Sequence, residues 1–341
     1  MSFILASGIV TVVLIYAFIN GFHDGGNVVA TMISSQTLRP RYAFAIGAVS
    51  EFIGAFFLGG AVARTISTGI VNPHLISIWS LFAALAGAIL WNIITWWWGF
   101  PSSSSHALIG GLVGAALIDS FLMSQGVWQL IYWRNLIWIL IVLFTSPLIG
   151  LCLGYLLTKL IFLLGGALSP KANRTFKNLQ ILSSFFIGIS HGSNDAPKAM
   201  GIIVMALIIL GIYRPQEGFA LPLWIVLICA VSFSFGVFRA SRRLIRTLGT
   251  ELYKIRPVHG FLSQSSSALI VVLSSLTGFP VSTTQIVNSS VIGVGAGHRA
   301  KAIRWKVARD IFLSWLFTIP GAGAIAVLLY LLVYWLTQAV C

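Results

Sequence analysis

Long apolar stretches, separated by short polar segments, follow one another along the whole 341-residue chain. A helix needs about 20 apolar residues to cross the hydrocarbon core of a bilayer, and fewer where it is broken. The pattern therefore predicts a bundle of membrane-spanning and re-entrant helices. They are expected at about 3–20 continuing past a break to 38, 42–62, 76–97, 102–118, 133–164, 180–190 continuing to 212, 221–238, 258–278, 284–297 and 310–336.

The composition excludes a water-soluble globular protein. Hydrophobic residues make up 58% of the chain and charged residues only 8%, whereas soluble domains carry about 25% charged residues. The formal net charge is +14, but the basic residues fall between apolar stretches, where they set the topology of a membrane protein. We therefore expect a multi-pass protein in a lipid bilayer, with no nucleic-acid partner.

The two halves of the chain share short motifs in the same order. Residues Gly21 to Asp24 match Gly192 to Asp195, and Gly99 to Ser103 match Gly278 to Ser282. Repeats of this kind are frequent in membrane transporters and are often inverted. We therefore predict a first transmembrane repeat at 1–164, a central cytoplasmic linker at 165–178 and a second transmembrane repeat at 179–341.

The placement of basic residues favours inversion. With the linker in the cytoplasm and with 76–118 and 258–297 as re-entrant hairpins, the cytoplasmic side receives all 21 basic residues except Arg64, Arg134, Arg214 and Lys198. This distribution follows the positive-inside rule. The predicted fold is an all-α polytopic membrane protein with two inverted-topology repeats, broken helices and paired re-entrant hairpins.

A polar motif with three glycines interrupts the first apolar stretch. It contains Asp24 and Asn27, and a charge at membrane depth normally faces the bundle interior or a wet cavity. Unwound backbone is tolerated there only where it is buried in protein or lines a cavity. The oxygens of this motif suit a sodium ion or a proton relay, and the alternative is a polar kink that holds helices together. Glu51, also in mid-span, is a candidate coupling-ion ligand or proton carrier, or a structural partner.

The matching motif of the second half contains Asn194, Asp195 and Lys198. Aligned on the aspartates, Lys198 stands where the first half has Asn27. An ammonium inside a membrane needs a nearby anion, which is expected to be Asp195, Asp24 or an anionic substrate. The alternative is a structural pair between Asp195 and Lys198.

Two clusters of hydroxyl residues each follow Gly-Phe-Pro and open a glycine-rich helix. Their members are Ser102, Ser103, Ser104, Ser105, Ser282, Thr283 and Thr284. The N-terminus of a helix presents free N–H groups and the positive end of its dipole, and it therefore binds anions such as phosphate. Two such ends from opposed hairpins would surround a tetrahedral oxyanion. The alternative is ordinary capping and helix packing.

These residues resemble the PiT family of inorganic phosphate transporters in its bacterial form. The matching stretches are NGFHDGGNVVAT (20–31), HGSNDAPKAMGI (191–202), 99–111 and 278–295. The resemblance implies secondary transport of inorganic phosphate by symport with sodium or protons. It also implies a homodimer and, for a bacterium, location in the inner or plasma membrane. No enzymatic activity is expected, and no cofactor beyond the co-transported ion.

The resemblance implies roles for residues that match its motifs, and Lys198 and Glu51 join them from their positions in the chain. The phosphate site is expected to use Ser102, Ser103, Ser104, Ser105, Ser282, Thr283, Thr284, Asn194 and Lys198. The coupling ion is expected at Asp24, Asn27, Asp195 and Glu51, with sodium held by Asp24, Asn27 and Asp195.

This chain departs from the family pattern at two places. Gln285 stands where the family is expected to have a histidine, which argues against a proton step at that position. Gly25 and Gly26 stand where a small residue and an alanine are usual, which is expected to loosen the break.

Four other functions are alternatives, and the last of them fits the sequence poorly. Sulfate has the same tetrahedral shape as phosphate, and a branch of the family is associated with it, so a sulfate permease is an alternative, as is transport of a metal–phosphate complex. An anion channel would use the same helix ends without accumulating its substrate. An intramembrane enzyme would pair Ser105 with His106 or Ser190 with His191, and neighbours in sequence do not face each other on a helix.

Overall fold

The computed structural model describes residues 2–123, 126–164, 170–214 and 219–340. Within these ranges the regular structure is helical, apart from an isolated bridge between Val71 and Ile131. The helices are α1 (Ser2–Asp24), α2 (Gly26–Ser34), α3 (Pro40–Leu58), α4 (Gly60–Thr68), α5 (Ile78–Trp98), α6 (Ser104–Leu122), α7 (Val127–Leu130), α8 (Trp133–Leu163), α9 (Pro170–Ile209), α10 (Leu223–Phe238), α11 (Arg242–Arg246), η1 (Thr247–Glu251), α12 (Pro257–Leu276), α13 (Thr283–Arg299), η2 (Ala300–Ala302) and α14 (Trp305–Val340).

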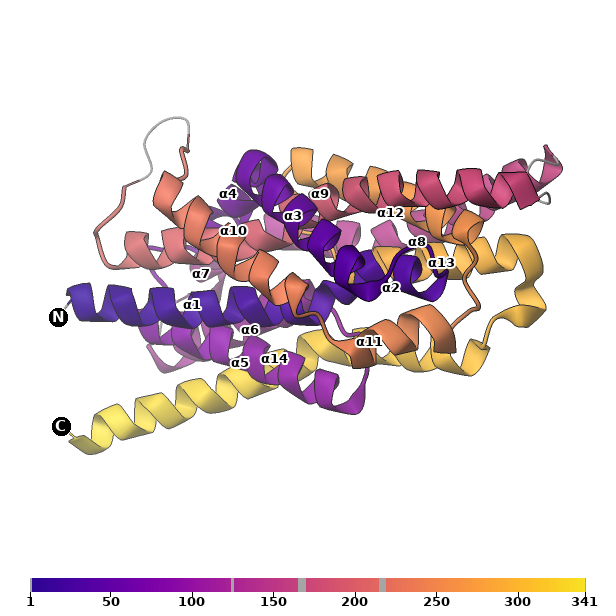
Figure 1. The fold of residues 1–341 in the computed structure, drawn as a ribbon. Coiled ribbons are helices and arrows are strands. Elements are labelled where there is room, and N and C mark those ends of the chain that lie inside the picture. Colours follow the sequence, from indigo (N-terminus) through magenta and orange to yellow (C-terminus); the bar gives the residue numbers. More distant parts are fainter. Residues whose placement is uncertain (1, 124–125, 165–169, 215–218, 341) are drawn as a thin grey trace.

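The helices form an elongated bundle whose two termini lie at the same end (Figure 1). Six segments of the described chain are long and apolar enough to cross a membrane. They are Phe3–Ser34, Pro40–Leu58, Ile78–Trp98, Ser104–Leu122, Trp133–Leu163 and Trp305–Leu336. Large apolar side chains such as Phe57, Phe121 and Leu276 are exposed on the outside, where lipid is the expected solvent. The predicted all-helical, multi-pass membrane fold is confirmed.

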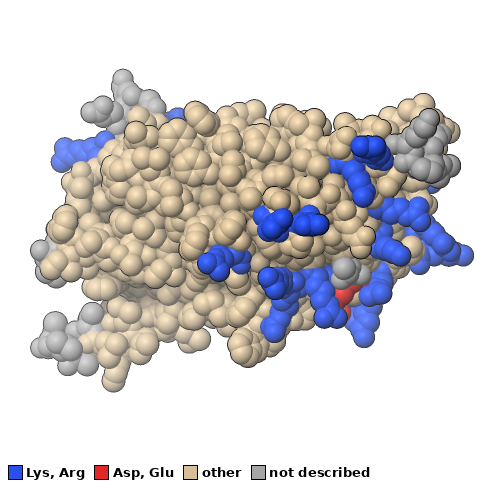
Figure 2. Space-filling model, in the orientation of Figure 1, with Lys and Arg blue, Asp and Glu red and all other residues tan. Residues whose placement is uncertain are grey.

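Basic residues are concentrated in one half of the molecule. On the face drawn in Figure 2, most Lys and Arg lie in the half away from the two termini. Helix α8 ends in that half and α9 begins there (Figure 1). Helix α9 begins at Pro170, inside the segment predicted as a linker, and residues 165–169 lie outside the described residues.

The two aspartate motifs differ in their backbone. Helices α1 and α2 are separated by a single residue, Gly25, which itself has helical angles (φ −57°, ψ −22°). In the second half, α9 runs unbroken from Pro170 to Ile209, through the predicted interruption. The second motif has Ala196 and Pro197 where the first has Gly25 and Gly26, and α9 continues through Pro197 although proline is the residue that most weakens a helix interior.

The glycines of the first motif serve close packing more than unwinding. A Cβ at Gly21 would lie 2.1 Å from the carbonyl oxygen of Phe233, and one at Gly25 would lie 2.9 Å from Val237 Cα. Helix α10 therefore approaches α1 to backbone contact. The same contact recurs in the second half, where a Cβ at Gly192 on α9 would lie 2.1 Å from the carbonyl oxygen of Glu51 on α3.

Each helix pair that carries a hydroxyl cluster packs against the last long helix of the other half. Helices α5 and α6 pack against α14, whereas α12 and α13 pack against α8. This exchange joins the two halves across the bundle. It also brings the hydroxyl residues that follow the turns, Ser102 to Ser105 and Ser282 to Thr284, into the interior.

The two turns have the same backbone design. Gly99 and Gly278 both adopt left-handed angles, with φ of +75° and +79°, which only glycine adopts without strain. The next residue in each turn, Phe100 or Phe279, donates its N–H over 2.9 Å to a carbonyl of the preceding helix. A serine then caps the following helix.

Candidate functional site

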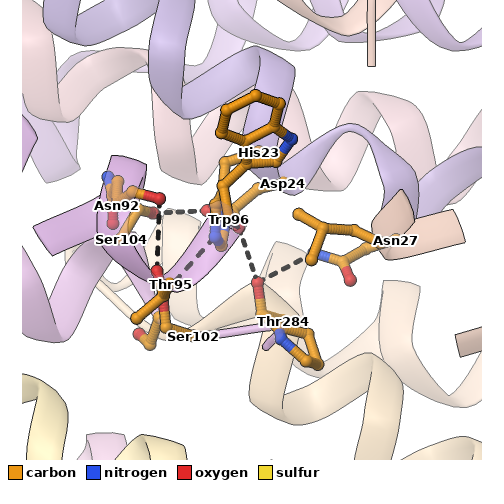
Figure 3. A network of polar contacts seen from close by, with 12 residues as sticks. His23, Asp24, Asn27, Asn92, Thr95, Trp96, Ser102, Ser104 and Thr284 are labelled. Atoms are coloured by element: carbon orange, nitrogen blue, oxygen red, sulfur yellow. Dashed lines mark hydrogen bonds and ion pairs between the residues drawn. The ribbon is translucent and has the colours of Figure 1, made fainter. Parts of the chain in front are cut away.

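Asp24 lies between the two hydroxyl clusters. Its Oδ2 accepts a hydrogen bond from Ser104 Oγ on α6 at 2.5 Å, and its Oδ1 accepts one from Thr284 Oγ1 on α13 at 2.9 Å. Figure 3 shows the aspartate between these two side chains, with His23 beside it. His23 Nδ1 lies 2.8 Å from Asp24 Oδ1. One carboxylate at the end of α1 thus holds the first turns of both helices.

Asn27 completes this first cluster from α2. Its Nδ2 donates to Thr284 Oγ1 at 2.8 Å (Figure 3). Asp24, Asn27, Ser104 and Thr284 are all at most 2% exposed. Four oxygen-bearing side chains from four helices therefore meet in a site closed to solvent.

Asp195 and Lys198 on α9 form a second cluster. Asp195 Oδ2 accepts from Thr283 Oγ1 at 2.9 Å, and its Oδ1 accepts from the Lys198 ammonium. Lys198 Nζ also donates to Ser105 Oγ at 2.5 Å and to the carbonyl oxygen of Val281 at 3.1 Å. The predicted pairing of Lys198 with Asp195 is therefore present.

Glu51 is connected to this second cluster through a histidine. His191 Nδ1 lies 3.0 Å from Glu51 Oε2, and His191 Nε2 lies 3.0 Å from Asp195 Oδ2. All three side chains are fully buried. His191 was not predicted to take part in ion or phosphate binding, although its position four residues before Asp195 places both on one face of a helix. No pattern in the sequence predicted the contact of His191 with Glu51 on α3.

Two further predicted site residues, Asn194 and Ser102, bond to the turns before α13 and α6 and to the helices beside them. Asn194 donates to Ser275 Oγ and to the carbonyl oxygen of Phe279, both at 3.1 Å, and accepts from the N–H of Val281 at 3.1 Å. These bonds anchor the second turn on α9. Ser102 Oγ lies 2.8 Å from Thr95 Oγ1 on α5.

Ser103 and Ser282 are the N-cap residues of α6 and α13. Their hydroxyl oxygens accept from the N–H groups of His106 and Gln285 at 3.2 Å and 3.3 Å. The residues of the two hydroxyl clusters therefore have different roles. Ser104, Thr283 and Thr284 contact the aspartates, Ser105 contacts the lysine, and Ser102, Ser103 and Ser282 stabilise the turns.

The first turns of α6 and α13 contact each other directly. Ser105 Oγ donates to the carbonyl oxygen of Val281 at 2.7 Å, and Gln285 Nε2 lies 3.3 Å from His106 Nε2. Two positive helix ends thus lie next to two buried carboxylates. Such a site offers N–H and hydroxyl donors to an anion and carboxylate, hydroxyl and amide oxygens to a small cation.

The chain matches the model of the phosphate transporter family over residues 20–326. It is 40% identical to a probable low-affinity inorganic phosphate transporter of Rhizobium meliloti, covering 97% of both chains. It is 39% identical to a protein of the same description in Bacillus subtilis, covering 96% of both. Its fold is similar to that of a solved chain titled "The sodium-dependent phosphate transporter", with a TM-score of 0.86, 24% identity and coverage of 99% of this chain and 100% of that one. The expected family is therefore confirmed, and the chain belongs to the phosphate transporter family, whose members are transporters and not enzymes.

Proposed function

We propose that this protein moves inorganic phosphate across the cell membrane by symport with a sodium ion or a proton, through alternating access to one buried site. The observation that carries the proposal is the sharing of Asp24 between Ser104 of α6 and Thr284 of α13. The negative Asp24 side chain bonds to the first turns of α6 and α13, whose positive ends would bind the anion. A cation held by Asp24 would therefore lie next to the anion, and the binding of one would affect the binding of the other. The relatives described as phosphate transporters support phosphate as that anion.

Phosphate is expected between the first turns of α6 and α13. The N-terminal N–H groups and the hydroxyls of Ser104, Ser105, Thr283 and Thr284 supply donors without adding charge. These hydroxyls are buried and bond to Asp24, Asp195, Lys198 or Val281. Entry of phosphate therefore requires them to exchange protein partners for substrate oxygens.

The coupling cation is expected at Asp24 and Asn27. A carboxylate with hydroxyl and amide oxygens around it provides the hard ligands that a small cation prefers. The cation also neutralises charge that would otherwise repel the anion, since a buried charge is tolerated only when it is paired. In this proposal the cation and phosphate bind together because each lowers the cost of burying the other.

Two cavities support alternating access. One, of about 390 Å³, abuts the first turn at Gly99 and Phe100 and is lined by Arg243. The other, of about 360 Å³, abuts the second turn at Gly278 and Phe279 and is lined by Arg64. The positive-inside distribution assigns these two arginines to opposite sides of the membrane. Inverted repeats that tilt against each other would open one cavity and then the other to the site.

Uptake of radiolabelled phosphate into proteoliposomes tests the function, with sodium and proton gradients imposed separately. Accumulation above equilibrium under one gradient is the expected result and identifies the ion. Strong inhibition by sulfate, followed by sulfate uptake, would replace phosphate with sulfate. Equilibration without accumulation would indicate a channel, and a requirement for a divalent cation in the same assay would indicate a metal–phosphate substrate.

The homodimer is a further part of the proposal and rests on the family resemblance alone. The exposed apolar faces suit lipid as well as a second copy. Cross-linking in membranes followed by mass determination of the purified protein tests it, and a single-chain mass at all concentrations would contradict it.

A further inference from the structure

The two buried clusters correspond to each other residue by residue. Asp24 accepts from Ser104 as Asp195 accepts from Thr283. Asn27 donates to Thr284 at 2.8 Å as Lys198 donates to Ser105 at 2.5 Å. In each cluster one hydroxyl comes from the hairpin of the same half and the other from the hairpin of the opposite half. The clusters are therefore two versions of one arrangement of oxygens.

The versions differ most in charge. The first has the neutral amide of Asn27 where the second has the ammonium of Lys198, which is fully buried. Lys198 Nζ is surrounded by a carboxylate oxygen of Asp195, the hydroxyl of Ser105 and the carbonyl oxygen of Val281. These are the kinds of ligand that a monovalent cation would take from the protein.

We propose that the Lys198 ammonium is a built-in cation that occupies the second of two equivalent coupling-ion sites, so that only the Asp24 and Asn27 site takes an ion from solution. This inference rests on the proposed symport and refines its stoichiometry. The chain carries one positive charge permanently at Asp195. It therefore binds phosphate together with one dissolved cation fewer than a protein that has asparagine, as at Asn27, in both clusters.

The hydrogen bonds of Lys198 set this role apart from direct binding of phosphate. An ammonium has three donors, and all three have protein oxygens within 3.1 Å. A lysine that held the substrate would lose one of these bonds at each binding event. A tethered cation keeps them all, and it acts on phosphate through its charge and through the position of Ser105.

The role also has a consequence for energy coupling. A dissolved cation that crosses with phosphate adds its electrochemical gradient to the driving force, whereas a tethered ammonium returns with the protein and adds nothing. Replacement of one dissolved ion by Lys198 therefore lowers the maximal accumulation ratio. The site at Asp195, however, is occupied by the Lys198 ammonium at every external sodium concentration.

The test is the Lys198→Asn variant, which gives both halves the same residue. Phosphate binding to purified protein is measured across a sodium titration, and the slope of log affinity against log sodium activity counts the ions bound with phosphate. The expected result is a slope larger by about one in the variant than in the wild type, whether the wild-type slope is zero or one. Without sodium, phosphate binding of the variant falls about tenfold or more.

A double variant, Lys198→Asn with Asp195→Asn, is the matched control. It lacks the carboxylate that would hold the new ion, so its slope is expected to return to the wild-type value. An unchanged slope in a folded Lys198→Asn protein would overturn the inference, as would loss of phosphate binding at every sodium concentration. If that variant does not fold, the ratio of labelled sodium to labelled phosphate transported by the wild type decides. One sodium or none per phosphate supports the inference, and two or more overturn it.

The two proposals fail in different ways. A wild-type protein that neither binds nor accumulates phosphate contradicts the proposed symport. A wild-type protein that accumulates phosphate, with no gain of sodium dependence in Lys198→Asn, contradicts only the role of Lys198.

Discussion

Thr284 Oγ1 donates a hydrogen bond to Asp24 Oδ1 over 2.9 Å, although the two residues are 260 positions apart in the chain. The same hydroxyl accepts from Asn27. This one contact connects the end of α1 and the start of α2 to the first turn of α13. It makes the motif of the first half, at Asp24 and Asn27, depend on the hairpin of the second.

Replacing Asp24 with asparagine is expected to abolish gradient-driven phosphate uptake while leaving membrane insertion intact. The amide keeps the shape of the side chain but removes the charge that holds the cation and the two hydroxyls. Loss of a charged hydrogen-bonding partner corresponds to a fall of at least about tenfold. Asp195→Asn is expected to have the same effect. Asp119→Asn is the control, since Asp119 is also buried but accepts its hydrogen bonds from Tyr330 and from the N–H of Ser77. Normal uptake by both Asp24→Asn and Asp195→Asn would contradict the role of these aspartates.

Thr284→Val removes the hydroxyl that Asp24 and Asn27 share. The shape is preserved, but both partners lose a hydrogen bond in a buried site, so phosphate uptake at low substrate concentration is expected to fall about tenfold. Thr145→Val is the matched control, because Thr145 on α8 is exposed and bonds to the carbonyl oxygens of Ile141 and Val142 in its own helix. Uptake kinetics in proteoliposomes provide the measurement, and equal uptake by the two variants would argue against Thr284 as a site residue.

Glu51→Gln is expected to abolish net accumulation of phosphate while leaving the exchange of phosphate across the membrane intact. Glu51 contacts His191, which contacts Asp195, so its charge contributes to the charge balance of the Asp195 and Lys198 cluster and lies away from the hydroxyls proposed to bind phosphate. The variant should retain phosphate exchange across the membrane in counterflow and lose accumulation under a gradient. Asp119→Asn, at a buried acid that bonds to Tyr330, again serves as the control. Parallel loss of counterflow and accumulation would instead indicate a structural role for Glu51.

Gly21→Ala is expected to destabilise the protein because its Cβ would lie 2.1 Å from the carbonyl oxygen of Phe233. Overpacking of this kind costs about 1–3 kcal/mol. Gly60→Ala is the matched control, since nothing lies within 4 Å of a Cβ at that position. Thermal unfolding of the detergent-solubilised variants compares the two. Equal unfolding temperatures would show that α10 moves away from α1 at little cost.

Much of the fold follows from the sequence because it depends on local properties. Apolar length located the membrane helices. The prolines and serines at 101–103 and 280–282 located the starts of α6 and α13 to within two residues. The left-handed turns at Gly99 and Gly278 also arise from neighbouring residues, since glycine alone adopts those angles freely. A helix that crosses lipid forms its backbone hydrogen bonds within its own segment. Its position can therefore be predicted from the local sequence.

The tertiary structure alone decided which polar residues meet. Ser104 and Ser103 are neighbours in one cluster, yet Ser104 contacts Asp24 whereas Ser103 caps its own helix. The contact of His191 with Glu51 and the bonds of Lys198 to Ser105 and Val281 also join segments far apart in the chain. These pairings depend on how closely α10 and α3 pack against α1 and α9. That distance is set by backbone contacts at Gly21 and Gly192, because helices in a membrane associate through close packing of small residues.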